Sequence, residues 1–100
     1  MVMGAPPADV VTSALLALDT PALLLDAARM ARNIARMQAR MTALGVRFRP
    51  HVKTSKAIEV VRRQRDAGAR GITVSTLKEA DTFFAAGFDG LYLDRVDTWE

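Results

Sequence analysis

A repeated junction between helix-like and strand-like segments constrains the fold of this chain more than any other feature. The motif Gly-x-x-Gly occurs at residues 68–71 and again at 87–90, and each copy separates an apolar helical pattern from a short apolar run. Glycine commonly ends a helix and allows a tight connection to the next element. The repeat therefore predicts helix-to-strand units of similar length that follow one another along the chain.

Periodicity and capping residues place the other elements around these junctions. Asp26 is a predicted N-cap, and Gly45 is the C-terminal cap of the helix between them. Thr76 and Glu79 form a capping box at the start of a later helix. Residues 1–12 carry Pro6 and Pro7 and are expected to be irregular. We predict strands at residues 22–25, 46–53, 71–75 and 90–93, and helices at 27–44, 56–67 and 77–86.

Strands that alternate with helices at this spacing predict an α/β fold with parallel strands and crossover helices. Such units form an open doubly wound sheet or a closed barrel. The nucleotide-binding motifs GxGxxG and GxxxxGK[ST] follow none of the expected strands, which favours the barrel. A (β/α)8 barrel of the TIM type needs about 250 residues. We therefore predict a leader (1–18), an incomplete N-terminal part of such a barrel (19–94), and a divergent or truncated tail (95–100).

Composition excludes several classes of protein. Half of the 100 residues are hydrophobic and a quarter are charged, as in ordinary globular domains. No apolar run approaches the roughly 18 residues needed to cross a bilayer, so no membrane partner is expected. The chain has no cysteine, which excludes disulfides, thiolate metal sites and cysteine nucleophiles and fits a cytoplasmic protein.

One basic stripe raises the alternative of a nucleic-acid-binding fragment. The net charge is only +3, but four arginines recur at helical spacing: Arg29, Arg32, Arg36 and Arg40. No aromatic residues are interleaved with them to stack on bases. We therefore favour a solvated helix face and expect no nucleic-acid partner.

Three basic or titratable residues alternate along the predicted strand 46–53. Arg49, His51 and Lys53 share one face of it, and Lys53 stands at its carboxyl end, where parallel α/β folds bind their ligands. Neighbouring positive charge and partial desolvation would favour a neutral amine, which is the form that attacks a carbonyl. The alternative is a surface edge where all three are solvated. Lys56 and Lys78 fall in first turns of predicted helices and are expected to be surface residues.

Three segments resemble a known enzyme family. TPALLLD (20–26), RPHVKTSK (49–56) and GITVSTLKEA (71–80) are similar to the D-threonine aldolases, which belong to the alanine-racemase-like, fold-type III group of pyridoxal-phosphate enzymes. The PHVKT core is shared with the related D-serine dehydratases. Ser55, where those dehydratases typically have His, favours the aldolase together with ITVSTLKEA. The chain departs from the family pattern at LDRVDTWE, its last eight residues.

The resemblance implies that Lys53 binds pyridoxal 5'-phosphate as a Schiff base, with His51 and Arg49 as neighbours that tune it. The implied reaction cleaves a D-3-hydroxy amino acid, such as D-threonine, to glycine and an aldehyde. It also implies a divalent metal whose ligands lie outside this chain, and a full-length relative that can form a homodimer. The 100-residue chain is expected to be inactive alone. Two alternatives stay open, a D-serine dehydratase-like or other racemase or lyase, and a non-catalytic pyridoxal-phosphate-binding protein.

Overall fold

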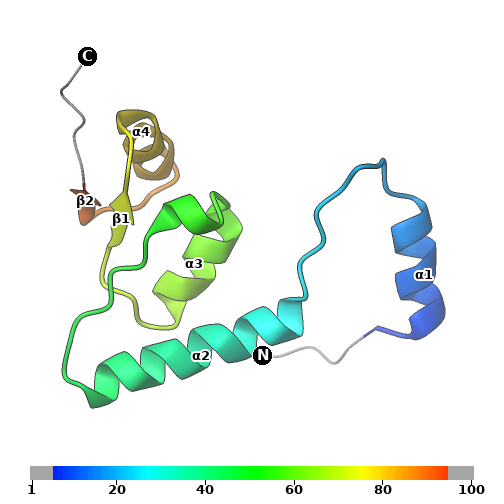
Figure 1. Ribbon diagram of the computed structural model, residues 1–100, viewed down its shortest axis with the longest axis horizontal. Helices are drawn as coiled ribbons and strands as arrows, with labels where there is room; N and C mark the ends of the chain where they lie inside the picture. Colours follow the sequence, from blue (N-terminus) through cyan, green and yellow to red (C-terminus); the bar gives the residue numbers. More distant parts are fainter. Residues whose placement is uncertain (1–5, 95–100) are drawn as a thin grey trace.

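The computed structural model describes residues 6–94, which contain four α-helices, one short 3-10 helix and a small parallel sheet (Figure 1). In chain order the elements are α1 (Ala8–Leu16), α2 (Ala27–Ala43), η1 (Val52–Thr54), α3 (Ile58–Asp66), β1 (Ile72–Val74), α4 (Leu77–Ala85) and β2 (Leu91–Leu93). The strands β1 and β2 run parallel, with Ile72 opposite Leu91 and Val74 opposite Leu93. This confirms the predicted helix–strand alternation from residue 58 onward.

A third extended segment joins the sheet on the other edge of β1. His51 forms a parallel bridge with Thr73, and the Thr73 N–H donates to the Pro50 carbonyl at 2.9 Å. The three segments therefore lie side by side in chain order and point the same way. Their carboxyl ends meet at one edge of the sheet, which is the edge where the site residues are expected.

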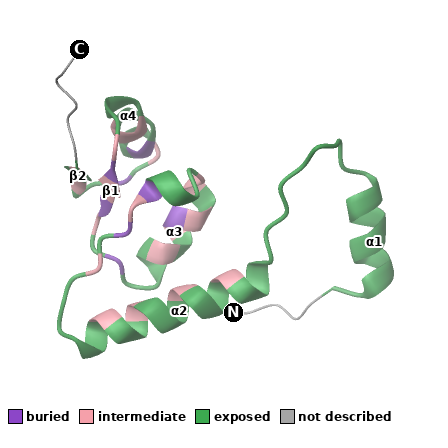
Figure 2. Ribbon diagram, viewed as in Figure 1, coloured by how far each residue is buried: buried purple, intermediate pink, exposed green. Residues whose placement is uncertain are grey.

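The core lies where this sheet meets α3 and α4 (Figure 2). Phe83 of α4 and Phe88 stack edge to face, with ring centroids 5.5 Å apart. The Arg65 guanidinium lies 4.6 Å from the centroid of the Phe88 ring and covers it. The buried side chains of this cluster are Val52, Val61, Ile72, Val74, Phe83 and Phe88. The short strands thus owe their position to packing against the helices.

Both predicted N-caps are confirmed. The Asp26 carboxylate accepts the Arg29 N–H at 2.9 Å, and Thr76 Oγ1 accepts the Glu79 N–H at 3.0 Å. These bonds satisfy donors that a helix start otherwise leaves unpaired. Local chemistry alone fixes these two helix starts.

The expected irregularity of residues 1–12 is wrong for residues 8–12, because they belong to α1 (Ala8–Leu16), whereas the leader as a separate unit (1–18) stays a prediction. The two prolines precede the helix rather than interrupt it, and Pro7 is its N-cap residue. Proline is well tolerated at this position because its missing N–H would have had no partner there. The predicted tail at 95–100 lies outside the described residues.

Two predicted strands are not formed as such. Residues 22–25 form no strand and have no β partner among the described residues, and Leu23, Leu24 and Leu25 are exposed. Residues 46–53 pair with β1 only at His51 and then turn into η1. A strand needs partners on its edges, and Pro50 also lacks the N–H that would extend the ladder.

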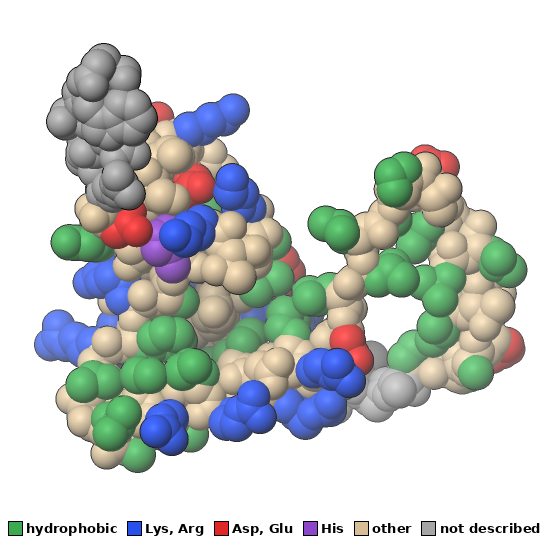
Figure 3. Space-filling view, in the orientation of Figure 1, with side chains coloured by type: hydrophobic (Ala, Val, Ile, Leu, Met, Phe, Trp, Pro, Cys, Tyr) green, Lys and Arg blue, Asp and Glu red, His purple; other side chains and the backbone are tan. Residues whose placement is uncertain are grey.

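Helix α2 extends along one side of the core, and α1 lies apart from it (Figure 1). Basic side chains line α2 (Figure 3), and all four arginines of the predicted stripe are exposed. This is the solvated face that the sequence favours. No helix within residues 6–94 is long and apolar enough to cross a membrane.

Gly71 offers a test of the packing at the amino ends of the strands. A Cβ there would lie 2.5 Å from the Gly90 carbonyl oxygen and 2.6 Å from Arg49 Nη1, whereas one at Gly87 would meet nothing within 4 Å. Both glycines have a positive φ, so Gly87→Ala is the matched control for backbone strain. Gly71→Ala should lower the free energy of unfolding by about 1–3 kcal/mol more than Gly87→Ala. Equal losses in urea denaturation would contradict this packing.

Candidate active site

Lys53 lies at the carboxyl edge of the sheet, on η1. Val52 beside it is fully buried and anchors this turn in the core, whereas Lys53 is exposed. The Lys56 N–H donates to the Val52 carbonyl at 2.7 Å and closes the turn. The anchored turn therefore presents a primary amine to solvent at the edge where parallel sheets bind ligands. The partial desolvation of Lys53 expected from the sequence is absent from the described structure.

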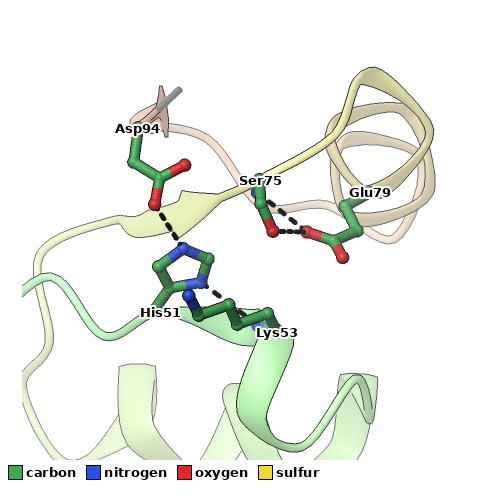
Figure 4. Close-up of polar contacts among 5 residues, drawn as sticks. All are labelled: His51, Lys53, Ser75, Glu79 and Asp94. Carbon is green, nitrogen blue, oxygen red and sulfur yellow. Dashed lines mark hydrogen bonds and ion pairs between the residues drawn. The ribbon is translucent and has the colours of Figure 1, made fainter. Parts of the chain in front are cut away.

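His51 connects the Lys53 turn to the end of strand β2, which lies on the other side of β1. Its Nε2 lies 2.7 Å from Asp94 Oδ2, and its Nδ1 accepts the Lys53 backbone N–H at 3.2 Å (Figure 4). The His51 and Asp94 side chains are 23% and 31% exposed. Both are partly shielded from water, which strengthens their interaction relative to a fully solvated pair. His51 therefore contacts the Lys53 backbone, and its expected influence on the Lys53 amine stays a prediction.

Arg49 lies at the opposite edge of the sheet. Its Nη1 donates to the Gly90 carbonyl and, at 3.5 Å, to the Ile72 carbonyl. Gly71 and Gly90 precede β1 and β2, so these contacts close the amino ends of the strands. These contacts do not reproduce the expected placement of Arg49 on the same side as Lys53. Arg49 also lines, with His51, a hollow beside α2, and its contact with the cofactor stays a prediction.

Glu79 organises the carboxyl end of β1. One of its carboxylate oxygens accepts the Ser75 N–H at 2.8 Å and the Ser75 hydroxyl at 3.2 Å (Figure 4). The other oxygen lies 3.9 Å from Lys56 Nζ. The Ser75 N–H bond lowers the pKa of Glu79 below its ordinary value. Lys56 is a largely exposed surface residue, as the sequence predicts, and so is Lys78.

A hollow of about 540 Å³ lies next to the Lys53 turn, between α2 and the segment that precedes α3. His51, Thr54 and Ser55 line one wall, and Met30 and Ile34 of α2 line the other. Lys53 does not line this hollow. Among the described residues no group of three His, Cys, Asp or Glu side chains is placed to hold a metal ion.

Asp94 was not singled out from the sequence, although one signal points to it. It directly follows β2, and polar residues just after parallel strands lie at the ligand-binding edge. It falls within LDRVDTWE (93–100), which is expected to depart from the family pattern, but that expectation is wrong for residues 93–96, because the family match reported below extends through residue 96. The position of Asp94 directly after β2 is therefore the sequence feature that indicates its place near the site.

Residues 25–96 match the family described as alanine racemase, N-terminal domain. The chain belongs to this family. Its members are fold-type III pyridoxal-phosphate enzymes with a TIM-barrel-type domain, so the predicted fold family is confirmed. The curated proteins that the chain resembles are pyridoxal-phosphate-dependent lyases, which supports the prediction of this enzyme class.

Among these relatives, D-threo-3-hydroxyaspartate dehydratase from Delftia sp. (strain HT23) is 71% identical over 73 residues, which are 73% of this chain and 19% of that protein. D-threonine aldolase from Arthrobacter sp. is 40% identical over 77 residues, 77% of this chain and 20% of that protein. The chain thus spans about a fifth of the curated relatives it matches.

Solved structures give the same picture. The Delftia sp. HT23 dehydratase superposes with a TM-score of 0.81 at 62% identity, covering 84% of this chain and 22% of that one. D-threonine aldolase from Filomicrobium marinum superposes with a TM-score of 0.71 at 36% identity, covering 73% of this chain and 20% of that one. The described arrangement therefore corresponds to about a fifth of the length of these solved chains.

The pKa of Glu79 leads to a prediction about acid stability. Because the folded-state pKa lies below the ordinary value of 4.5, the carboxylate stabilises the fold above that pH and loses its contribution as the pH falls through the lowered pKa. Glu79→Ala should cost about 1 kcal/mol at pH 7. The gap between the variant and the parent should narrow below about pH 4.5. A pH-independent gap in urea denaturation would contradict the assigned contact.

Proposed function

We propose that this chain is the N-terminal part of a pyridoxal-phosphate-dependent lyase that acts on D-3-hydroxy amino acids, with Lys53 as the residue that holds the cofactor. The single observation that supports this most is the placement of Lys53. It presents an exposed primary amine at the carboxyl edge of the sheet, on a turn anchored by buried Val52.

The described residues supply only part of the cofactor site, and this part fits pyridoxal phosphate. A Schiff base requires an accessible lysine amine, and Lys53 has no ion pair among the contacts of residues 6–94. When bound, the cofactor supplies an electron sink for charge that develops at the substrate Cα. The chain's own residues hold Lys53 in place, through His51 and Asp94. The phosphate and metal ligands of the proposed enzyme would come from residues beyond those described.

The favoured reaction is loss of water from the substrate, because the Delftia dehydratase is 71% identical over most of this chain. The Cα–H and Cβ–O bonds break, the proton and the hydroxyl leave together as one water, and hydrolysis of the resulting enamine by a second water releases a keto acid and ammonia. The second candidate is aldol cleavage, in which the Cα–Cβ bond breaks to give glycine and an aldehyde. Ser55 and the similarity to the D-threonine aldolases favour that alternative.

Cofactor attachment can be tested in a chimera in which this chain replaces the matching segment of the Delftia dehydratase. Borohydride reduction after incubation with pyridoxal phosphate should fix the label on the peptide that contains Lys53, since that amine is the one exposed at the sheet edge. Lys53→Ala should abolish labelling at this peptide. Lys56→Ala is the matched control and should leave it unchanged. Label on Lys56 or Lys78 in the parent chimera would refute the assignment.

One substrate separates the two reactions. Loss of water from D-threo-3-hydroxyaspartate yields oxaloacetate and ammonia, whereas aldol cleavage yields glycine and glyoxylate. We expect oxaloacetate as the dominant product of the chimera, with activity lost on chelation and restored by a divalent cation. If glycine and glyoxylate dominate instead, the dehydration proposal is wrong and aldol cleavage replaces it. Ser55→His should then shift the product back towards oxaloacetate if Ser55 decides the outcome.

A further inference from the structure

The imidazole of His51 is engaged at both nitrogens. Nε2 lies 2.7 Å from Asp94 Oδ2, and Nδ1 lies 3.2 Å from the backbone nitrogen of Lys53 (Figure 4). The ring therefore links the residue after β2 to the turn that carries Lys53. The contact with Asp94 joins residues 43 positions apart in sequence, whereas the contact with the Lys53 backbone is local.

The partners of the ring determine where its proton lies. A backbone N–H is always a donor, so Nδ1 must offer its lone pair to Lys53. An ionised carboxylate only accepts, so Nε2 must carry the proton that it donates to Asp94. Both contacts are satisfied together only by the neutral ring protonated at Nε2.

Other charged groups near the ring have separate partners or positions. Asp26 and Arg29 face it across the hollow beside α2. Glu79 is bound to Ser75 and lies near Lys56, and the Arg49 guanidinium lies at the amino ends of the strands. The Lys53 amine belongs to the same turn. Among the described residues, Asp94 is the carboxylate in direct contact with the ring.

We infer that Asp94 is a positioning residue, which acts through His51 to hold the turn that carries Lys53 and releases that hold when the ring takes up a second proton. A proton from solvent would bind Nδ1 and turn it from an acceptor into a donor. Two donors would then face each other, and the Lys53 N–H would lose its acceptor. The contact to Asp94 would persist because an imidazolium still donates from Nε2.

The construction of the turn makes this release local. His51 is the N-cap residue of η1 and its side chain caps the start of the turn, whereas the Lys56 N–H closes the other end on the Val52 carbonyl. Val52 stays anchored in the core. Loss of the ring contact therefore frees Lys53 more than its neighbours. Only the chemical role of the Lys53 amine rests on the proposed function; the contact network does not.

Nuclear magnetic resonance of the 100-residue chain tests the proton assignment directly, because His51 is its single histidine. With 15N-labelled histidine at neutral pH, we expect Nδ1 at the shift of an unprotonated nitrogen and a visible proton on Nε2. The Lys53 amide should be protected from hydrogen exchange. On acidification, this protection should fall with the same midpoint as the shift change of the ring nitrogens. A proton on Nδ1 at neutral pH, or an unprotected Lys53 amide, would overturn the inference.

Variants at Asp94 separate positioning from general stability. Asp94→Leu removes the acceptor and should lower the protection factor of the Lys53 amide about fivefold. Asp94→Asn keeps an acceptor oxygen and should change it less than about twofold. Asp81→Asn is the matched control on the exposed face of α4 and should have no effect. An equal protection factor of the Lys53 amide in the parent and in Asp94→Leu would overturn the positioning role. An equal loss of protection at the Val61 and Lys53 amides would overturn it as well, because it would indicate general destabilisation.

The outcome is distinguishable from failure of the proposed function. If Lys53 is labelled normally in the chimera but its amide is unprotected, the lyase proposal is retained and the positioning role of Asp94 is refuted. A protected amide that titrates with His51, with no pyridoxal phosphate bound at Lys53, would leave the His51–Asp94 contact standing and remove the lyase proposal.

Discussion

The parallel bridge between His51 and Thr73 is the constraint on which the candidate site depends. It aligns residues 50–51 with β1, and β1 in turn pairs in register with β2. The carboxyl ends of all three segments therefore meet at one edge. Lys53, Ser75 and Asp94 each follow their own segment there, although they are spread over more than 40 residues of sequence. Without this alignment His51 could not contact Asp94 while it also caps the Lys53 turn.

The two ends of the small sheet have different roles. At the amino ends, Gly71 and Gly90 leave room for the Arg49 guanidinium to contact backbone carbonyls. The interactions at this end therefore stabilise the packing of the strands. At the carboxyl ends, polar and charged side chains gather around Lys53. Parallel α/β folds commonly divide stability and chemistry in this way. The division explains why Arg49 and Lys53, which alternate along one segment, take part in different interactions.

Sequence patterns predicted the features that depend on local chemistry. The caps at Asp26 and Thr76 and the helices that follow them need only neighbouring residues, and both formed as expected. The strands at 22–25 and 46–53 failed because pairing depends on partners elsewhere in the fold. Lys53 and His51 were found by alternation and by resemblance to the family. The contact of Asp94 with His51, 43 positions away, could not be predicted from local patterns, and only its position directly after β2 indicates that it lies near the site.

The central claim is that the anchored Lys53 turn is the attachment point of the cofactor. A crystal structure of the chimera grown with pyridoxal phosphate tests it most directly. The account predicts continuous electron density from Lys53 Nζ to the cofactor, with His51 still within hydrogen-bond distance of both Asp94 and the Lys53 backbone nitrogen. Density that joins the cofactor to another lysine, or cofactor bound away from the carboxyl edge of the sheet, would contradict it.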